Sequence, residues 1–483
     1  MKKHPKKSPS GTSIPRYINI KCVITAVILL VCSFSARAIV PDPYTLSIST
    51  NLTNMYGGGV TIAGCTLAQL EAATLASITT DAGGYSNATS YVNAALAPRG
   101  DQTTIAPALA GYLASGQPLL VASLIGAGAI QAVPTVSGSI TTAILNLGAI
   151  SNTVTFAALL ERGVTNNSVA VGQIAQAIAA SYPVITNSNN YSTDPRINLA
   201  LRMMSASPSS AAVIVQQIAQ TMNINYTNNP PTLPSYDQRE QLAQFAYYLS
   251  QRVPATVASQ VAIGLIQANY EMAPRIVNAM LYGNSSIAPG PFVQSVAKVV
   301  DPEEAVELAT AIAFGPGVQS EGVSGPVTQA GTQPYLNGVQ PYLNSSNYLY
   351  SAQIATAISG VIVSKESGSQ LTADLSALAA VLSNKVASLG SGAAFQNEVA
   401  SLAFLIASKN PASARQIANT VTQAIKPFYA NPSSLVYVTM ATRLGSLAGN
   451  TSALIQSSIQ SGLSGGTFAW GSLNTDETPN TNL

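Results

Sequence analysis

Carboxylates are the side chains that could carry acid–base chemistry in this sequence. The single histidine, His4, lies in a predicted leader, so imidazole-dependent catalysis and histidine-based zinc sites are excluded from the rest of the chain. Glu161, Asp237, Glu240 and Glu271 could supply the two carboxylates of a glycoside hydrolase. Against this, the single tryptophan lies in the C-terminal tail, which leaves few aromatic platforms for sugar rings.

Two further clusters have ordinary structural explanations. Ser295 and Lys298 match S-x-x-K, but no K-T-G motif accompanies them. The run Asp301–Glu304 is the densest acidic group, and it reads as a helix start. Asp301 would be the N-cap, Pro302 the first helical residue, and Glu304 the partner in a capping box. We therefore expect a non-enzyme with no catalytic residue, no metal and no cofactor.

Tyrosines in and beside a long irregular segment are the candidate binding residues. Residues 315–347 are rich in Gly, Pro, Ser and Gln, and they contain the pentapeptide QPYLN twice, at 333–337 and 340–344. Segments this long inside a helical array are usually functional or disordered. Tyrosine gives a large contact area at low entropic cost, so we predict partner binding by Tyr335, Tyr342, Tyr348 and Tyr350. The alternative is a loop whose tyrosines only pack on the array.

The first 38 residues have the pattern of a signal peptide. A basic stretch precedes an apolar run from Cys22 to Phe34, and small residues at Ala36 and Ala38 fit a cleavage site. We expect a bacterial protein secreted to the periplasm, outer envelope or extracellular space; an uncleaved anchor is the alternative. Cleavage would leave Cys65 as the only cysteine, with 14 basic and 19 acidic residues and a net charge of −5. Such a chain has no basic patch for nucleic acid.

Helical periodicity dominates most of the chain beyond this leader. The stretch Tyr236–Asn269 reads as two helices separated at Pro254, and we expect the second to be the more buried one. Similar pairs recur, and the prolines that open their second helices, Pro208, Pro254 and Pro302, are 46 and 48 residues apart. This period predicts an all-α protein of stacked αα-hairpins, a solenoid of HEAT or armadillo type. A closed α/α toroid has the same periodicity and is the alternative.

Composition divides the chain into successive regions. Alternation of Tyr44, Leu46, Ile48 and Thr50 predicts an extended N-terminal arm over 39–62. The predicted organisation is then a hairpin array over 63–314, the irregular loop over 315–347, the continued array over 348–463 and a disordered tail over 464–483. Abundant Ala, Gly and Ser predict close approach of neighbouring helices.

The low charge of the chain favours an interaction protein. Only 8% of residues are charged, so the surface must consist mainly of amides and hydroxyls. We expect a non-catalytic structural or protein-binding protein that can self-associate and that does not bind a membrane after cleavage. Two alternatives remain open. One is the carbohydrate-active enzyme described above, and the other is a membrane-associated assembly formed through residues 102–160, which carry no charge.

Overall fold

The structure, a computed structural model, is almost entirely helical. It describes residues 42–148, 150–164, 166–183, 192–222, 227–228, 231–232, 236–315, 341–466 and 468. Within these ranges the only extended pair is β1 (Thr227–Asn228) with β2 (Pro231–Thr232), which are antiparallel. The predicted all-α class is therefore confirmed.

The helices form two layers, because each helix packs on its neighbour in sequence and also on the helix two positions further along. We call the layers even and odd after the helix numbers. The even layer holds α2 (Pro43–Tyr56), α4 (Ala88–Leu96), α6 (Leu119–Ala132), α8 (Thr153–Glu161), α10 (Pro195–Ala206), α12 (Tyr236–Ser250), α14 (Ala273–Gly283), α16 (Pro302–Phe314), α18 (Gly368–Leu389), α20 (Ala414–Ile425) and α22 (Ser452–Ser464). The odd layer holds α3 (Leu67–Thr80), α5 (Gln102–Ala114), α7 (Ser137–Leu145), α9 (Ser168–Ala180), α11 (Ala211–Gln220), α13 (Ala255–Ala268), α15 (Pro289–Ala297), α17 (Tyr350–Lys365), α19 (Ala393–Ala407) and α21 (Leu435–Gly445).

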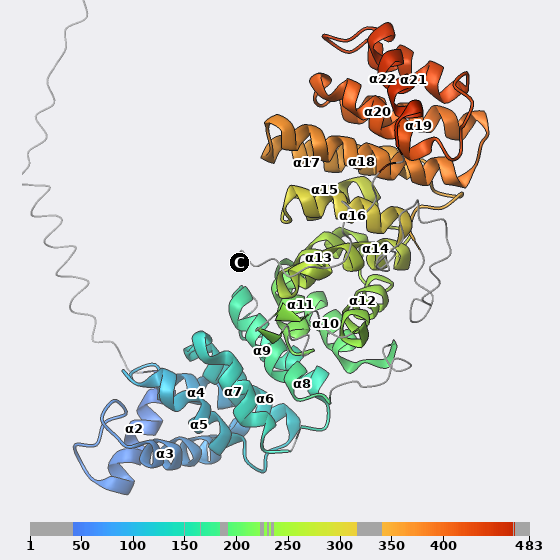
Figure 1. The fold of residues 1–483 in the computed structure, drawn as a ribbon. Coiled ribbons are helices and arrows are strands. Elements are labelled where there is room, and N and C mark those ends of the chain that lie inside the picture. The colour runs from blue at the N-terminus through green and yellow to red at the C-terminus, as the bar shows by residue number, and fades with distance from the viewer. Residues whose placement is uncertain are drawn as a thin grey trace, which may run out of the picture.

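The stacked pairs build an open, bent array (Figure 1). Helices α2 and α3 lie at one end, and α21 and α22 lie at the other, far from the first. In the middle of the bend, α9, α11 and α13 border the hollow side. The arrangement is that of an α-solenoid, and the described helices do not close into a toroid.

Short 3-10 turns begin several helices. They are η1 (Gly84–Asn87), η2 (Pro134–Val136), η4 (Pro208–Ser210), η5 (Tyr270–Met272) and η7 (Pro411–Ser413). Three of them open with proline, whose fixed φ suits a first turn and whose missing N–H is not needed there. Side-chain caps start other helices; at α3 the Thr66 hydroxyl and the Gln69 side chain form a reciprocal capping box.

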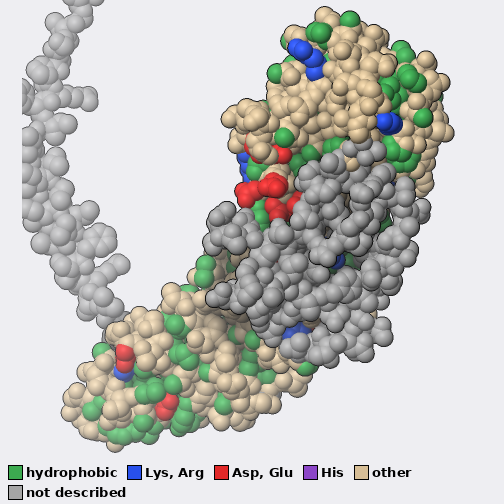
Figure 2. All heavy atoms as spheres, in the orientation of Figure 1, with side chains coloured by type: hydrophobic (Ala, Val, Ile, Leu, Met, Phe, Trp, Pro, Cys, Tyr) green, Lys and Arg blue, Asp and Glu red, His purple; other side chains and the backbone are tan. Residues whose placement is uncertain are grey.

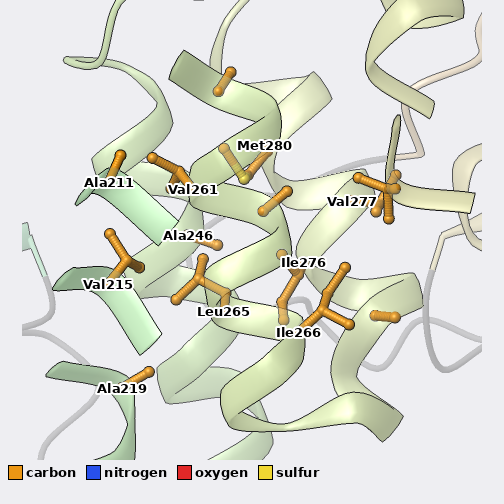
Figure 3. Close-up of a cluster of buried hydrophobic side chains, with 14 of the residues drawn as sticks. Ala211, Val215, Ala219, Ala246, Val261, Leu265, Ile266, Ile276, Val277 and Met280 are labelled. Atoms are coloured by element: carbon orange, nitrogen blue, oxygen red, sulfur yellow. The ribbon is translucent and has the colours of Figure 1, made fainter. Parts of the chain in front are cut away.

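The core around α13 shows how the layers are held together (Figure 3). Val261 and Leu265 of α13 lie between Val215 of α11 and Ile276 of α14, and all four are fully buried. At Gly264 the two odd-layer helices come so close that an added Cβ would lie 2.2 Å from the carbonyl oxygen of Ala212. The predicted close approach through small residues is therefore confirmed at this contact.

The relative burial of this central pair differs from the prediction. Helices α12 and α13 are present, but all of residues 241–250 in α12 except Tyr247 and Tyr248 are buried, against six of the 14 residues of α13. The polar side chains of Gln241, Gln244 and Ser250 are enclosed together with the apolar stripe. Apolar periodicity could not reveal this burial, because it counts only hydrophobic residues.

The predicted extended arm is wrong over most of its length, since residues 43–56 form α2. The side chain of Asp42 accepts hydrogen bonds from the N–H groups of Tyr44 and Thr45, and Pro43 occupies the first turn. Ile48 and Leu52, spaced four residues apart, are fully buried. Docking of this helical face on the array outweighs the strand preference of the alternating β-branched residues.

The regular spacing of the three prolines conceals a change in layer. Between Pro208 and Pro254 the chain makes the two helices α11 and α12, with a long connection between them. Between Pro254 and Pro302 it makes three, α13, α14 and α15. Because successive helices alternate between the two layers, three helices between two prolines place the next proline-opened helix in the other layer. Pro254 opens the odd-layer helix α13, whereas Pro302 is in the first turn of the even-layer helix α16.

Candidate functional site

The predicted binding tyrosines are divided between core and surface. Tyr335 lies outside the described residues, as do Ala36 and Ala38 of the predicted cleavage site. Tyr350, at the start of α17, is 39% exposed, and the neighbouring Leu349 is 62% exposed. Tyr348 is half-buried with its ring centroid 4.7 Å from that of Phe395. Partner binding by these residues stays a prediction, with Tyr350 the one on the surface.

Tyr342 has a structural role in the second copy of the repeated pentapeptide. Its side chain is 8% exposed, and burial raises its phenol pKa to about 12. The Tyr342 N–H donates to the Asn278 side chain at 2.9 Å, and the Leu343 N–H donates to the Ile312 carbonyl oxygen at 3.0 Å. Leu343 is fully buried. Residues 342–343 therefore fasten the end of the long connection to α14 and α16.

The carboxylates named for a sugar-cleaving enzyme do not form a described pair. Glu161 is fully buried at the end of α8, with neither carboxylate oxygen hydrogen-bonded. The side chains of Asp237 and Glu240 lie outside the described residues. Glu271 is half-buried in η5 at the start of α14. Glu161 is thus inaccessible to a substrate in this structure.

An open groove lies between α7 and α9 in the odd layer. Its volume is about 690 Å³. Thr135, Ser139, Thr142 and Asn146 follow one side at helical spacing, and Gln173 and Gln176 face them from α9. Its lining contains no charged and no aromatic residue. A site of this chemistry can exchange hydrogen bonds with backbone amides and neutral polar side chains, but it offers no acid–base group.

The groove is built by the way its two helices meet. The Ser137 hydroxyl, in the first turn of α7, donates to Gln173 Oε1 at 2.8 Å. Gly138 lies beside it and faces α9, where an added Cβ would make an ordinary contact with Gln173 Cβ at 3.4 Å. This polar contact fixes the Gln173 side chain at one edge of the groove.

An acidic patch lies where α16, α17 and α18 meet. Residues 298–307 and 365–374 contain six acidic and two basic residues. Figure 2 shows acidic side chains gathered at this level of the array. The predicted helix start is present, but the Asp301 side chain does not cap it, so no capping box forms with Glu304. Instead the Asp301 N–H donates to the Tyr270 hydroxyl at 2.6 Å.

Two carboxyl groups of this patch touch each other, which the sequence did not reveal. Glu366 follows α17 and Asp374 lies eight positions later in α18. Burial raises the pKa of Glu366 to about 7, and a hydrogen bond to Asp374, with the negative charges of Asp374 and Glu303, adds to the rise. Asp374 is 7% exposed, and its other oxygen accepts from Gln370 at 3.0 Å.

The lone cysteine of the described residues is part of the core. Cys65 is 4% exposed, and burial raises the pKa of its thiol. The Arg99 guanidinium lies 3.4 Å from its sulfur and also binds Asp101 at 2.7 Å. Ser295 of the S-x-x-K match donates to the Pro291 carbonyl oxygen within its own helix, and Lys298 lies at the end of that helix.

The described residues provide neither a metal cluster nor a membrane-spanning helix. Among them, no group of three or more His, Cys, Asp or Glu side chains is placed to hold a metal ion. In the same ranges, no helix has both the length and the apolar character needed to cross a membrane. The uncharged stretch 102–160 is divided among α5, α6, α7 and α8.

Comparison with known proteins gives no further guide. The sequence matches no protein-family model, and it matches neither a curated protein nor a solved structure.

Proposed function

We propose that this chain is an exported, non-catalytic structural or protein-interaction protein of the cell envelope or extracellular space, able to self-associate. The observation that carries the proposal is the uncharged groove between α7 and α9 on an open helical array. Stacked helical arrays use extended surfaces of this kind for protein binding. A partner with neutral polar groups, including another copy of this charge-poor chain, fits that lining.

We further propose that the repeats are HEAT- or armadillo-like. From α18 onward, neighbouring units are joined by side-chain hydrogen bonds at sequence separations of 39 to 42, as between Asn419 and Ser458 and between Arg443 and Ser401. Tyr429 donates to the Gly390 carbonyl oxygen 39 positions away, and Asn384 donates to that of Ala424 40 positions away. Together with the proline spacing, the separations in the C-terminal part support units of about 40 residues, whereas earlier units are joined at shorter separations, such as 33 for Ser137 with Ala170.

The enzyme alternative has less support. Glu366 and Asp374 are the carboxyl pair in direct contact. Glycoside hydrolases hold their two carboxyl groups about 5 Å or more apart so that the sugar or a water fits between them. A pair in hydrogen-bond contact leaves no such space.

The groove can be tested by placing a charge in it. Thr142→Lys puts an ammonium on the exposed groove side of α7, and it should weaken self-association or partner capture because a neutral polar interface would have to bury an unpaired charge. Thr79→Lys makes the same change on the exposed surface of α3 and serves as the control. Sedimentation velocity and cross-linking on native cells would give the readout. A mature chain that stays monomeric and captures no partner at any concentration would contradict the proposal.

A further inference from the structure

One pentapeptide of the chain is docked on the helical array, and an identical pentapeptide precedes it. The sequence Gln-Pro-Tyr-Leu-Asn occurs at 333–337 and again at 340–344, seven positions later. The first copy lies outside the described residues, whereas the second is described from Pro341 onward. The contacts that hold the second copy therefore decide whether the first copy fits the same place.

The contacts between the second copy and the helices are made by the pentapeptide itself. The Tyr342 N–H donates to the Asn278 side chain of α14 at 2.9 Å, and the Leu343 N–H donates to the Ile312 carbonyl oxygen of α16 at 3.0 Å. Leu343 is fully buried, and Tyr342 is 8% exposed. Within the pentapeptide, the Asn344 side chain donates to the Tyr342 carbonyl oxygen at 3.2 Å. The first copy has the same Tyr, Leu and Asn on the same main chain, so it can form each of these contacts.

The connection can reach the site in either register. The docked Leu343 contacts Ile312, two residues before the end of α16, so the chain leaves this helix beside the site. In the described register 27 positions separate Gly315 from Tyr342, and 20 would separate it from Tyr335 in the same place. The probability of loop closure changes by only roughly 1.6-fold between these lengths, because closure entropy varies slowly with loop length. On the other side, the path to α17 gains seven residues.

Contacts outside the pentapeptide favour the described register. The Asn347 side chain donates to the Tyr342 carbonyl oxygen at 2.7 Å and accepts from the Asn344 N–H at 2.8 Å. The Tyr342 ring also stacks on the Tyr350 ring, with 6.2 Å between centroids. In the other register Gln340 would take the position of Asn347, with the same amide on a longer side chain. Neutral hydrogen bonds add little net stability, since their groups bond to water when they separate, so the two registers differ little in free energy.

We infer that the site on α14 and α16 accepts either copy of the pentapeptide, so that the connection between α16 and α17 exchanges between two registers seven residues apart. The inference goes beyond the proposed function and does not depend on the groove between α7 and α9. The site holds either Tyr342 or Tyr335 and releases the other. A partner that captures the released copy leaves the connection fastened by the docked one.

Cleavage by chymotrypsin distinguishes the registers, because this protease cuts after tyrosine and leucine and each copy contains both. The test uses brief digestion of the full mature chain, with the cleavage sites mapped by mass spectrometry. Leu343→Ala weakens docking of the second copy only. We expect it to speed cleavage after Tyr342 and to slow cleavage after Tyr335 about tenfold, because the first copy then occupies the site and cleavage needs an undocked chain. Leu349→Ala makes the same change at a 62% exposed position and should alter neither rate.

A milder variant keeps the test usable if Leu343→Ala fails to fold. Asn347→Ala removes the amide that bonds to the docked second copy and leaves both pentapeptides intact. It should slow cleavage after Tyr335 about threefold. Adding Leu336→Ala to either variant should abolish the slowing, because the first copy then loses its buried leucine. Unchanged cleavage after Tyr335 in both variants would overturn the inference, and so would slowing that persists when Leu336 is replaced.

Discussion

Replacement of Glu161 tests whether burial is the main control on the ionisation of a carboxyl group in this array. The side chain is 0% exposed at the last residue of α8, where the helix dipole also disfavours negative charge. Burial raises its pKa to about 7, and the positive charge of Arg202 offsets only part of the rise. Glu161→Gln keeps the shape of the side chain and removes its charge.

The size of the effect follows from the shift. A rise in the pKa of Glu161 from its ordinary value of 4.5 to about 7 corresponds to about 3 kcal/mol in the free energy of unfolding, at about 1.4 kcal/mol for each pKa unit. The folded chain holds the proton of Glu161 more tightly than the unfolded chain does. This contribution is therefore fully present below about pH 4.5 and is lost as the pH rises through about 7. The Gln variant should be within about 1 kcal/mol of the native chain near pH 5 and more stable by up to about 3 kcal/mol near pH 8.

Urea unfolding followed by circular dichroism at both pH values gives the variant-minus-native difference in free energy. Hydrogen exchange of peptides from α8 and α9 would localise it, since a solenoid can open repeat by repeat. Asp42→Asn is the control. The Thr45 hydroxyl lowers the pKa of Asp42, so Asp42 changes charge below the range from pH 5 to pH 8. The difference in unfolding free energy between Asp42→Asn and the native chain should therefore be the same at both pH values. A difference for Glu161→Gln that is the same near pH 5 and pH 8 would refute the reasoning.

Two further substitutions probe the packing, each against a control of the same residue type. Gly264→Ala should destabilise the chain by about 1–3 kcal/mol in urea unfolding, because the new methyl group meets the backbone of Ala212. The control, Gly360→Ala on the open surface of α17, should be neutral or stabilising by up to about 1 kcal/mol. Equal effects of the two would contradict the close approach of α11 and α13. Leu343→Ala should lower the free energy of unfolding by about 2–5 kcal/mol and speed proteolysis within 315–347, whereas Leu349→Ala, at an exposed site, should change both little. A Leu343→Ala variant with unchanged stability and proteolysis would show that residues 342–343 do not fasten the connection.

The fold class could be predicted because helical periodicity is a local property. The stripes that marked Tyr236–Asn269 became α12 and α13 at the predicted break, Pro254. Two errors arose from non-local effects. The alternating residues of α2 resemble a strand until a docking surface selects the face that carries Ile48 and Leu52. The burial of Gln244 depends on helices far along the chain, and the apolar pattern of one helix carries no information about them.

The candidate sites were harder to predict, because both depend on pairs of helices. The groove lining alternates small and polar residues such as Ser139 and Gln173, which in sequence look like any exposed helix surface. Glu366 and Asp374 lie eight residues apart across the start of α18, whose positive-φ residue Gly368 turns the chain between them. A spacing of eight across a helix start has no fixed geometry, so no motif search would select the pair.

The layer exchange explains why one sequence motif serves two purposes. Gln-Ile-Ala-Gln at 173–176 lies in α9 and recurs at 217–220 in α11, both in the odd layer, and Gln176 lines the groove. Its counterpart Gln-Ile-Ala-Asn at 416–419 lies in α20, beyond the three helices α13, α14 and α15 that shift the pattern to the even layer. There Asn419 donates to the Ser458 carbonyl oxygen at 3.3 Å and accepts from Gln423 at 3.0 Å, so its amide joins α20 to α22. The same motif therefore lines a groove in α9 and joins two even-layer helices in α20.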